Sequence, residues 1–254
     1  MHLKIQHFVI FITFIGLVSC TQEASKLSKI EGKILPIDSS YTANNAITEF
    51  VSPFRSRINQ ILDSTLTYAP HAITKTDGEL NTSAGNLMAD IVLTQASPIF
   101  KSRTDKEIDF VMMNHGGIRA VISQGNVSAR NAFEIMPFEN NIVVAELSAS
   151  DVRDMVSFLT RSGRAHPISG LQVIINKDKE IKSIKIKGKP IDKKKTYYVA
   201  TSDYLVSGGS TMGFFKNNTP ITDTDYLIRN AMIDYFKKVD TLAPKVDDRY
   251  FIEN

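Results

Sequence analysis

Cysteine and tryptophan are nearly missing from this sequence. Its 254 residues include one cysteine, Cys20, and no tryptophan. One cysteine cannot form an internal disulfide, nor can it supply a zinc site built from several thiolates. Histidine is scarce as well: two of the five histidines fall within the first ten residues, and the other three lie far apart without metal-ligand spacing. The composition thus argues against a metal centre built by this chain alone.

Charge of one sign is not in large excess either. The formal net charge is only +3, and the pI is near 8.8. The basic residues gather at 177–195, where residues 181–188 alternate between apolar and charged as the strands of an exposed hairpin do. No aromatic-rich basic face or known nucleic-acid module accompanies them, so we predict no nucleic-acid partner.

Continuous hydrophobic sequence is short. The apolar run at 8–18 falls well below the roughly 20 residues that span a bilayer, and with Lys4 before it the run is typical of a secretory leader. Leu17-Val18-Ser19-Cys20 resembles a bacterial lipobox, which predicts a lipoprotein signal peptide at 1–19 and a lipid on Cys20. An ordinary cleaved leader with a chance cysteine is the alternative. We therefore expect a bacterial cell-envelope protein, attached to a membrane by its lipid, that faces the periplasm or lies at the outer membrane.

The rest of the chain fits one domain. Residues 20–40 are mostly polar and predict a tether, and residues 41–254 are numerous enough to bury one core. No internal repeat or low-complexity block suggests a further domain.

Apolar periodicity predicts a mixture of helices and strands. An amphipathic helix is expected at 44–63, kinked or restarted at Pro53, and another begins at a cap formed by Thr82 or Ser83. A third helix follows Ser148 or Ser150, and a last one is expected over roughly 222–239. The expected extended segments are 66–73, 109–113, the start of 126–133, 141–147, 166–173, 181–188 and 196–201. This mixture, with much antiparallel pairing, predicts an α+β domain.

The most informative segment is Asn114-His115-Gly116-Gly117-Ile118-Arg119. It follows the apolar residues 110–113, so we expect a strand to run into a turn that contains two glycines. Glycines let backbone amides approach a ligand closely, and the planar guanidinium of Arg119 suits a tetrahedral anion. The segment predicts an anion pocket, and a tight turn closed by a surface arginine is the alternative. A lone histidine without a second ligand seldom binds metal, so we assign no chemistry to His115.

Two further segments accompany this loop. They are Pro137-Phe138-Glu139-Asn140 and the run Tyr204-Leu205-Val206-Ser207-Gly208-Gly209-Ser210. Together the three segments resemble the C-terminal domain family of the 5′-nucleotidases, in which an N-x-G-G-x-R loop, a P-F-x-N turn and an aromatic residue followed by G-G-D shape the nucleotide pocket. The likeness runs from about Leu66 to Phe251 with the motifs in family order. It implies the family's four-layered α/β/β/α domain with mixed sheets.

The resemblance also implies a set of substrate-binding residues. Arg119 and Asn114 would meet a phosphate or a hydroxyl, and the rings of Phe138 and Tyr204 would hold a flat nucleobase between them. The other predicted binding residues lie in the glycine-rich segments: Gly116, Gly117, Gly208, Gly209 and Ser210. The alternatives are an Asx turn at Asn114 and ordinary packing of the two rings.

Three positions depart from the family pattern. Ser210 stands where the family has an aspartate close to the ribose hydroxyls, which removes a charge-assisted acceptor. Asn81 replaces the glutamate of the Glu-Ser-x-Leu-Gly-Asn-Leu pattern, which Gly85-Asn86-Leu87 otherwise matches, and no arginine stands just before that helix. These departures favour a second hypothesis, a non-catalytic envelope binding or interaction protein that keeps the fold but has lost nucleotide specificity.

Catalysis in full-length members of the family depends on residues that this sequence lacks. Those enzymes hydrolyse phosphate esters with two metal ions held by an N-terminal domain, whose signatures D-x-H, G-D and G-N-H-E do not occur here. We therefore expect no catalytic residue and no cofactor in this chain, with divalent metal ions only on a separate metallophosphoesterase partner. The first hypothesis is the nucleotide-binding domain of a 5′-nucleotidase-type hydrolase. A self-sufficient hydrolase ranks last, because no nucleophile, base and orienting partner can be assigned.

Overall fold

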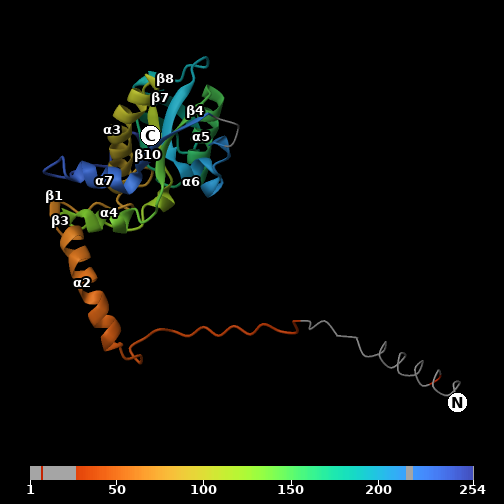
Figure 1. The fold of residues 1–254 in the computed structure, drawn as a ribbon. Helices are drawn as coiled ribbons and strands as arrows, with labels where there is room; N and C mark the ends of the chain where they lie inside the picture. Colours follow the sequence, from red (N-terminus) through yellow and green to blue (C-terminus); the bar gives the residue numbers. More distant parts are fainter. Residues whose placement is uncertain (1–6, 8–26, 216–219, 254) are drawn as a thin grey trace. The chain divides into compact units, whose positions relative to one another are not determined.

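The computed structural model describes residue 7 and residues 27–215 and 220–253 (Figure 1). The predicted leader and its lipid site, Cys20, lie outside these residues, except for His7. The chain divides into two compact units, residues 1–50 and 51–254. All described residues of the first unit are exposed. No helix of the described residues has the length and apolar character needed to cross a membrane.

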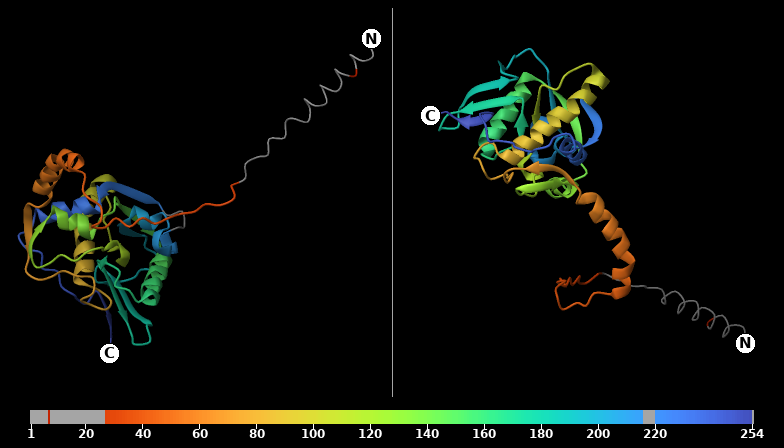
Figure 2. Two further views of the ribbon diagram at one scale, coloured as in Figure 1. Left: turned by 90° about the horizontal axis from the view of Figure 1, so that it is seen from below. Right: turned by 90° about the vertical axis from the view of Figure 1, so that its left-hand side faces the viewer.

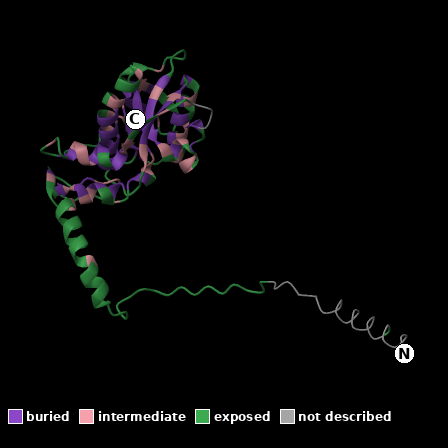
Figure 3. Ribbon diagram, viewed as in Figure 1, coloured by how far each residue is buried: buried purple, intermediate pink, exposed green. Residues whose placement is uncertain are grey.

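Helix α2 (Asn45–Leu62) matches the first predicted helix and continues through Pro53 without interruption. None of its residues is buried, and all except Val51 and Leu62 are exposed (Figure 3). Its last turn is tied to helix α4 (Ala129–Ile135), where Arg130 binds Asp63 and donates to Asn59 Oδ1 at 2.9 Å. Next along the chain, β1 (Thr65–Ala69) pairs antiparallel with β3 (Gly125–Ser128).

A five-stranded sheet forms the centre of the second unit. Its order is β10-β4-β9-β2-β5, in which β2 and β9 are parallel and the other neighbours are antiparallel. The bounds are Ile221–Leu227 for β10, Asn141–Leu147 for β4, Tyr197–Ser202 for β9, Phe110–Met112 for β2 and Ile168–Ser169 for β5. Strands β2, β4 and β9 lie within the segments predicted as extended, apart from one residue at the end of β9.

A four-stranded sheet lies beside the central one, with the order β11-β6-β7-β8. Its strands are Tyr250–Ile252, Leu171–Ile175, Ile181–Ile186 and Lys189–Pro190 in that order. The turn between β7 and β8 has positive φ at Lys187 (48°) and Gly188 (76°), which suits the right-handed twist of a two-residue hairpin. The predicted lysine-rich hairpin is therefore confirmed.

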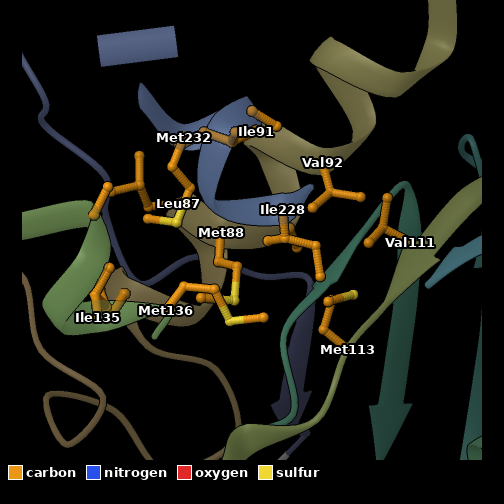
Figure 4. Packing of buried hydrophobic residues seen from close by; sticks show 14 of the residues in the cluster. Leu87, Met88, Ile91, Val92, Val111, Met113, Ile135, Met136, Ile228 and Met232 are labelled. Atoms are coloured by element: carbon orange, nitrogen blue, oxygen red, sulfur yellow. The ribbon is translucent and has the colours of Figure 1, made fainter. Parts of the chain in front are cut away.

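The two faces of the central sheet pack into two separate hydrophobic cores. Helices α3 (Ser83–Thr104) and α7 (Ile228–Phe236) pack with Val111 on one face, as the close-up of methionines and aliphatic side chains in Figure 4 shows. Phe110 and Met112 point to the other face, into a core shared by helix α5 (Ala149–Ser162) and the four-stranded sheet. Figures 1 and 2 show α3 in yellow and α5 in green with strands between them. The predicted α+β domain with mixed sheets is confirmed.

One predicted element is wrong in its first third. Residues 222–227, expected to begin the last helix, belong to strand β10, and helix α7 begins only at Ile228. The strand pairs with β4, with Thr222 opposite Val144. Thr224 is buried while Asp223 and Asp225 are exposed, which is the two-residue period of an edge strand. Acidic and β-branched residues at this period disfavour a helix start.

Candidate functional site

The glycine loop follows strand β2 and is tightly built. Asn114 precedes a single helical turn, η1 (His115–Gly117), and its backbone carbonyl accepts from the Gly117 N–H at 3.0 Å. The Asn114 side chain folds over both glycines: a Cβ on Gly117 would stand 3.1 Å from its Oδ1, and one on Gly116 would stand 3.3 Å from its Nδ2. A Cβ at either position would require the Asn114 side chain to shift by a few tenths of an ångström. The glycines therefore set the position of Asn114.

Arg119 closes the loop with its backbone and leaves its side chain in solvent. Its N–H donates to the Ile135 carbonyl at 2.9 Å, which ties the loop to helix α4. The guanidinium makes one long hydrogen bond, 3.4 Å from Nη1 to the Gly116 carbonyl, and pairs with no carboxylate among the described residues. Its Cζ lies 5.9 Å from the centre of the Phe138 ring. Arg119 is thus held near an aromatic surface with most of its donors unused.

The turn that carries Phe138 is fixed from below by a buried arginine. Arg229 of helix α7 is 5% exposed, pairs with Glu139 and donates to the Phe138 carbonyl at 3.4 Å. Its guanidinium also lies over the Phe133 ring, at 4.2 Å from the ring centre. The Phe138 ring itself is 40% exposed. The buried Arg229 thus holds the turn in place, and the Phe138 side chain that the turn carries lies outside the core.

Tyr204 is presented by helix α6 (Asp203–Val206), directly after strand β9. Ser202 caps the helix through its hydroxyl, which accepts from the Leu205 N–H at 3.3 Å. The Tyr204 ring is 46% exposed, and Gly209 lies against it so closely that a Cβ there would be 2.4 Å from two ring atoms. Gly208 has φ 102°, a conformation that side chains rarely adopt. The two glycines therefore allow the chain to turn back under the ring.

Seven of the nine predicted binding residues line one cavity of about 310 Å³. Gly208 and Gly209 do not line it and act from behind Tyr204. Asn140, the last residue of the P-F-x-N turn, lines the cavity although it was not among the predicted residues. The full lining is Asn114, Gly116, Gly117, Arg119, Phe138, Asn140, Tyr204 and Ser210. The structure brings distant loops together as expected, and ligand binding by these residues stays a prediction.

A second cavity of about 370 Å³ lies next to the first and contains two histidines. His115, which was assigned no chemistry from the sequence, places ring Nδ1 3.2 Å from the Ala165 carbonyl, so Nδ1 carries a proton and Nε2 is left for a partner. His166 is buried and its Nδ1 accepts from the His115 N–H at 3.3 Å. Burial lowers the pKa of His166 to about 4, against a smaller opposite effect of the Met113 backbone. His166 is therefore neutral at neutral pH.

Charge distinguishes these two cavities from a larger one elsewhere. Neither lining contains an aspartate or glutamate. A cavity of about 540 Å³ between the two sheets is lined by several lysines, yet Lys106 pairs with Glu146 and Lys187 with Glu107, each at 3.4 Å. Its buried Asp109 pairs with Lys195. Most charges of the larger cavity are thus paired internally, whereas the other two cavities offer cationic and polar donors to a ligand.

Asn81 plays a structural part. Its side chain is buried and uses all four of its hydrogen bonds: Nδ2 donates to the Asp247 and Tyr250 carbonyls, and Oδ1 accepts from Asn86 Nδ2 and the Asp247 N–H, all within 2.8–3.0 Å. This network joins the start of α3 to β11.

A lysine, Lys75, donates to the Ile118 carbonyl at 2.8 Å and so brings a cation to the glycine loop. No pattern in the sequence indicates that contact.

The described residues contain no group of three or more histidine, cysteine, aspartate or glutamate side chains that could hold a metal ion. Within the described part of the chain, the side chains therefore do not fit the two-metal centre that the family resemblance implies for the full-length enzymes.

Comparison with known proteins decides the family. The family model for the C-terminal domain of 5′-nucleotidase matches residues 64–217. The chain belongs to this family. Protein UshA of Escherichia coli strain K12 is 31% identical over 144 residues, which cover 54% of this chain and 26% of UshA. The trifunctional nucleotide phosphoesterase protein YfkN of Bacillus subtilis is 24% identical over 237 residues, covering 85% of this chain and 16% of YfkN.

Solved structures give the same result for the fold. The 5′-nucleotidase precursor from Thermus thermophilus superposes with a TM-score of 0.68 at 18% identity, covering 83% of this chain and 43% of that one. The chain therefore spans less than half the length of that protein and about a quarter or less of UshA and YfkN. The relationship concerns the C-terminal, substrate-binding domain of this 5′-nucleotidase family.

Proposed function

We propose that this chain is the nucleotide-binding domain of a 5′-nucleotidase-type hydrolase that acts in nucleotide catabolism, and that its metal centre is carried by a separate metallophosphoesterase chain. One observation carries the proposal: Arg119, Phe138 and Tyr204 come from three distant loops and line the same cavity. A nucleobase would lie between the two exposed rings, and a phosphate would meet Arg119 and the adjacent loop. Asn114 and Asn140 would orient hydroxyl groups.

The missing catalytic part defines what the partner must supply. The cavity of this chain offers donors and aromatic surface, and no aspartate or glutamate lines it that could hold a metal ion or activate a water. The proposed partner would provide the divalent metal ions and the activated water. This chain would bind the nucleotide and hold it with the phosphate turned towards the partner. We also propose that Cys20 carries a lipid that keeps this assembly at the bacterial envelope.

Calorimetric titration of the purified chain with AMP tests the binding part. We expect binding that Arg119→Ala weakens by roughly 10- to 100-fold, because a charge-assisted hydrogen bond contributes about 1.5–3 kcal/mol. Tyr204→Ala should weaken AMP binding to a similar extent through lost stacking, whereas Tyr204→Phe, which keeps the ring, should not. The proposal would be contradicted if AMP did not bind, or if neither Arg119→Ala nor Tyr204→Ala changed its affinity.

Phosphate release tests the two-chain part. We expect AMP hydrolysis only when this chain and a metallophosphoesterase chain are mixed in the presence of Mn²⁺, and the Arg119→Ala variant should lower the rate. Release by this chain alone, in a preparation free of other phosphatases, would show that the metal centre has been wrongly assigned to a partner.

A second function is favoured by one observation. Ser210 lines the cavity where the family resemblance predicts an aspartate, so a polar ligand meets no carboxylate there. A non-catalytic envelope protein that binds another ligand would share this feature. The titration separates the two functions, since this second one predicts that AMP, adenosine and inorganic phosphate all fail to bind.

A further inference from the structure

The cavity that contains the two histidines shares a wall with the proposed nucleotide cavity. Asn114, Gly116 and Ser210 line both. The wall is completed by the contact between Asn114 Nδ2 and Ser210 Oγ at 3.5 Å, which is long for a hydrogen bond. A ligand that lies across this wall would therefore occupy both cavities. The polar groups in the middle of such a ligand would lie close to Ser210.

Each cavity has its own arginine that pairs with no carboxylate of the described residues. Arg119 lines the first and Arg164, in the connection between α5 and β5, lines the second. The Arg164 side chain is exposed, and its guanidinium has no hydrogen bond or ion pair to any other described residue. Because Nδ1 of His115 carries the proton that meets the Ala165 carbonyl, Nε2 of the neutral ring is an acceptor and adds no donor. Thr211 also lines the second cavity, but its hydroxyl already donates to the Ser210 carbonyl at 2.7 Å. The unpaired Arg164 guanidinium and the Ser210 hydroxyl at the shared wall are the donors that suit a phosphate group.

We propose that the second cavity is an anion subsite of the same ligand site, and that the chain prefers nucleosides phosphorylated at two positions, with one phosphate near Arg119 and the other near Arg164. This inference rests on the proposed function, from which it takes the base and the first phosphate. Ser210 is central to it. A carboxylate at this shared wall would repel a second phosphate, whereas a hydroxyl can donate a hydrogen bond to one.

The first experiment compares the affinities of AMP and adenosine 3′,5′-bisphosphate for the full chain by calorimetric titration. We expect the bisphosphate to bind about tenfold more tightly, as one added charge-assisted contact would give. Arg164→Gln should bring the ratio of the two affinities close to one. Arg161→Gln is the matched control: Arg161 is exposed at the end of α5 and lines neither cavity, so the ratio should stay unchanged.

The second experiment changes only the charge of the shared wall. Ser210 has φ 56° and ψ 22°, a left-handed conformation that aspartate and asparagine tolerate better than most residues. Ser210→Asp should reverse the preference so that AMP binds more tightly than the bisphosphate. Ser210→Asn, which has the same shape without the charge, should keep a preference for the bisphosphate.

The outcomes separate the two proposals. If neither compound binds, the proposed function fails and the subsite fails with it. If AMP binds in the way that depends on Arg119 and Tyr204, but the bisphosphate gains nothing, only the subsite is wrong. The subsite is also overturned if Arg164→Gln and Arg161→Gln weaken the bisphosphate equally, or if Ser210→Asp and Ser210→Asn give the same ratio.

Discussion

Two polar regions of this domain use the same residue types in opposite ways. Around Asn81, the asparagine side chain is buried and all four of its hydrogen bonds are made within the protein. Around Asn114, the asparagine is half-buried and its side chain makes one long contact, to Ser210. Asn114 lies in the loop that the family resemblance assigns to the nucleotide pocket, whereas Asn81 stands where another family motif has a glutamate.

The two regions have different roles because their asparagine side chains differ in how many hydrogen bonds they already make within the protein. A buried amide with four partners cannot accept a ligand without losing hydrogen bonds, so the Asn81 network holds α3 to β11. An amide with unused donors and acceptors beside a cavity gains hydrogen bonds when a ligand enters. The number of internal hydrogen bonds therefore separates structural residues from candidate ligand residues within one motif set.

The largest effect is expected in the buried network. Asn81→Leu should leave the Asp247 N–H and the Asp247 and Tyr250 carbonyls without their partner, which we expect to lower the free energy of unfolding by about 4 kcal/mol. For a domain of this size, the melting temperature should fall by about 10 °C. Thermal unfolding followed by circular dichroism measures the change. Affinity for AMP per folded molecule should not change.

The matched control for this variant is Asn140→Leu. Asn140 lines the first cavity, and its side chain has no hydrogen bond to the other described residues. The same substitution there should change the free energy of unfolding by less than about 1 kcal/mol, and it should lower the affinity for AMP. Equal loss of stability in the two variants would remove the distinction between the two regions.

The next effect concerns His166, which lies at the border between core and cavity. Its pKa in the folded protein is about 4, below its usual 6.5, because burial disfavours the imidazolium. The unfolded chain therefore binds more protons between pH 6.5 and 4. Stability from this group is complete above pH 6.5 and is lost as the pH falls through this window, by at most about 3 kcal/mol.

Urea unfolding at several pH values checks this prediction. His166→Gln should flatten the pH dependence between pH 6.5 and 4, and a glutamine oxygen can still accept from the His115 N–H. His71→Gln, at an exposed histidine, should leave the pH dependence as it is. Desolvation raises the pKa of Asp247 but hydrogen bonds from Arg249 lower it overall, so its contribution to stability is lost as the pH falls through the usual 3.8, and this loss is the same in both histidine variants. An unchanged slope in His166→Gln would mean that the imidazole is solvated.

The sequence predicted most elements because local patterns specify them. Val111 alternates with Phe110 and Met112 between two cores, and Thr82 caps α3 by accepting from the Gly85 N–H at 3.2 Å, as its position before the apolar run indicates. Strand β10 was missed because its structure depends on pairing with β4, a partner distant in sequence.

The candidate site was predictable to a similar degree. Motifs identified the loops that line the first cavity, since glycine pairs and exposed aromatics are visible in the sequence. The second cavity was not predictable, because His115 and His166 acquire their tautomers and burial from contacts between residues about fifty positions apart. The role of Asn81 was likewise set by carbonyl groups near the end of the chain.

The smallest effect is expected from a change behind the Tyr204 ring. Gly209→Ala would place a methyl group 2.4 Å from two ring atoms and 2.6 Å from the Tyr204 carbonyl oxygen, so the ring must move from its position at the cavity and the backbone must shift. The ring is 46% exposed and can swing outwards, but the backbone carbonyl must shift as well, so we expect a loss of stability of about 1–2 kcal/mol. AMP affinity should fall by about tenfold, as expected when one stacking contact is lost. Gly213→Ala is the control, because nothing lies within 4 Å of a Cβ there. If Gly209→Ala kept full affinity, Tyr204 would not be a stacking partner, and the contrast between the two polar regions would then rest on Arg119 and Asn114 alone.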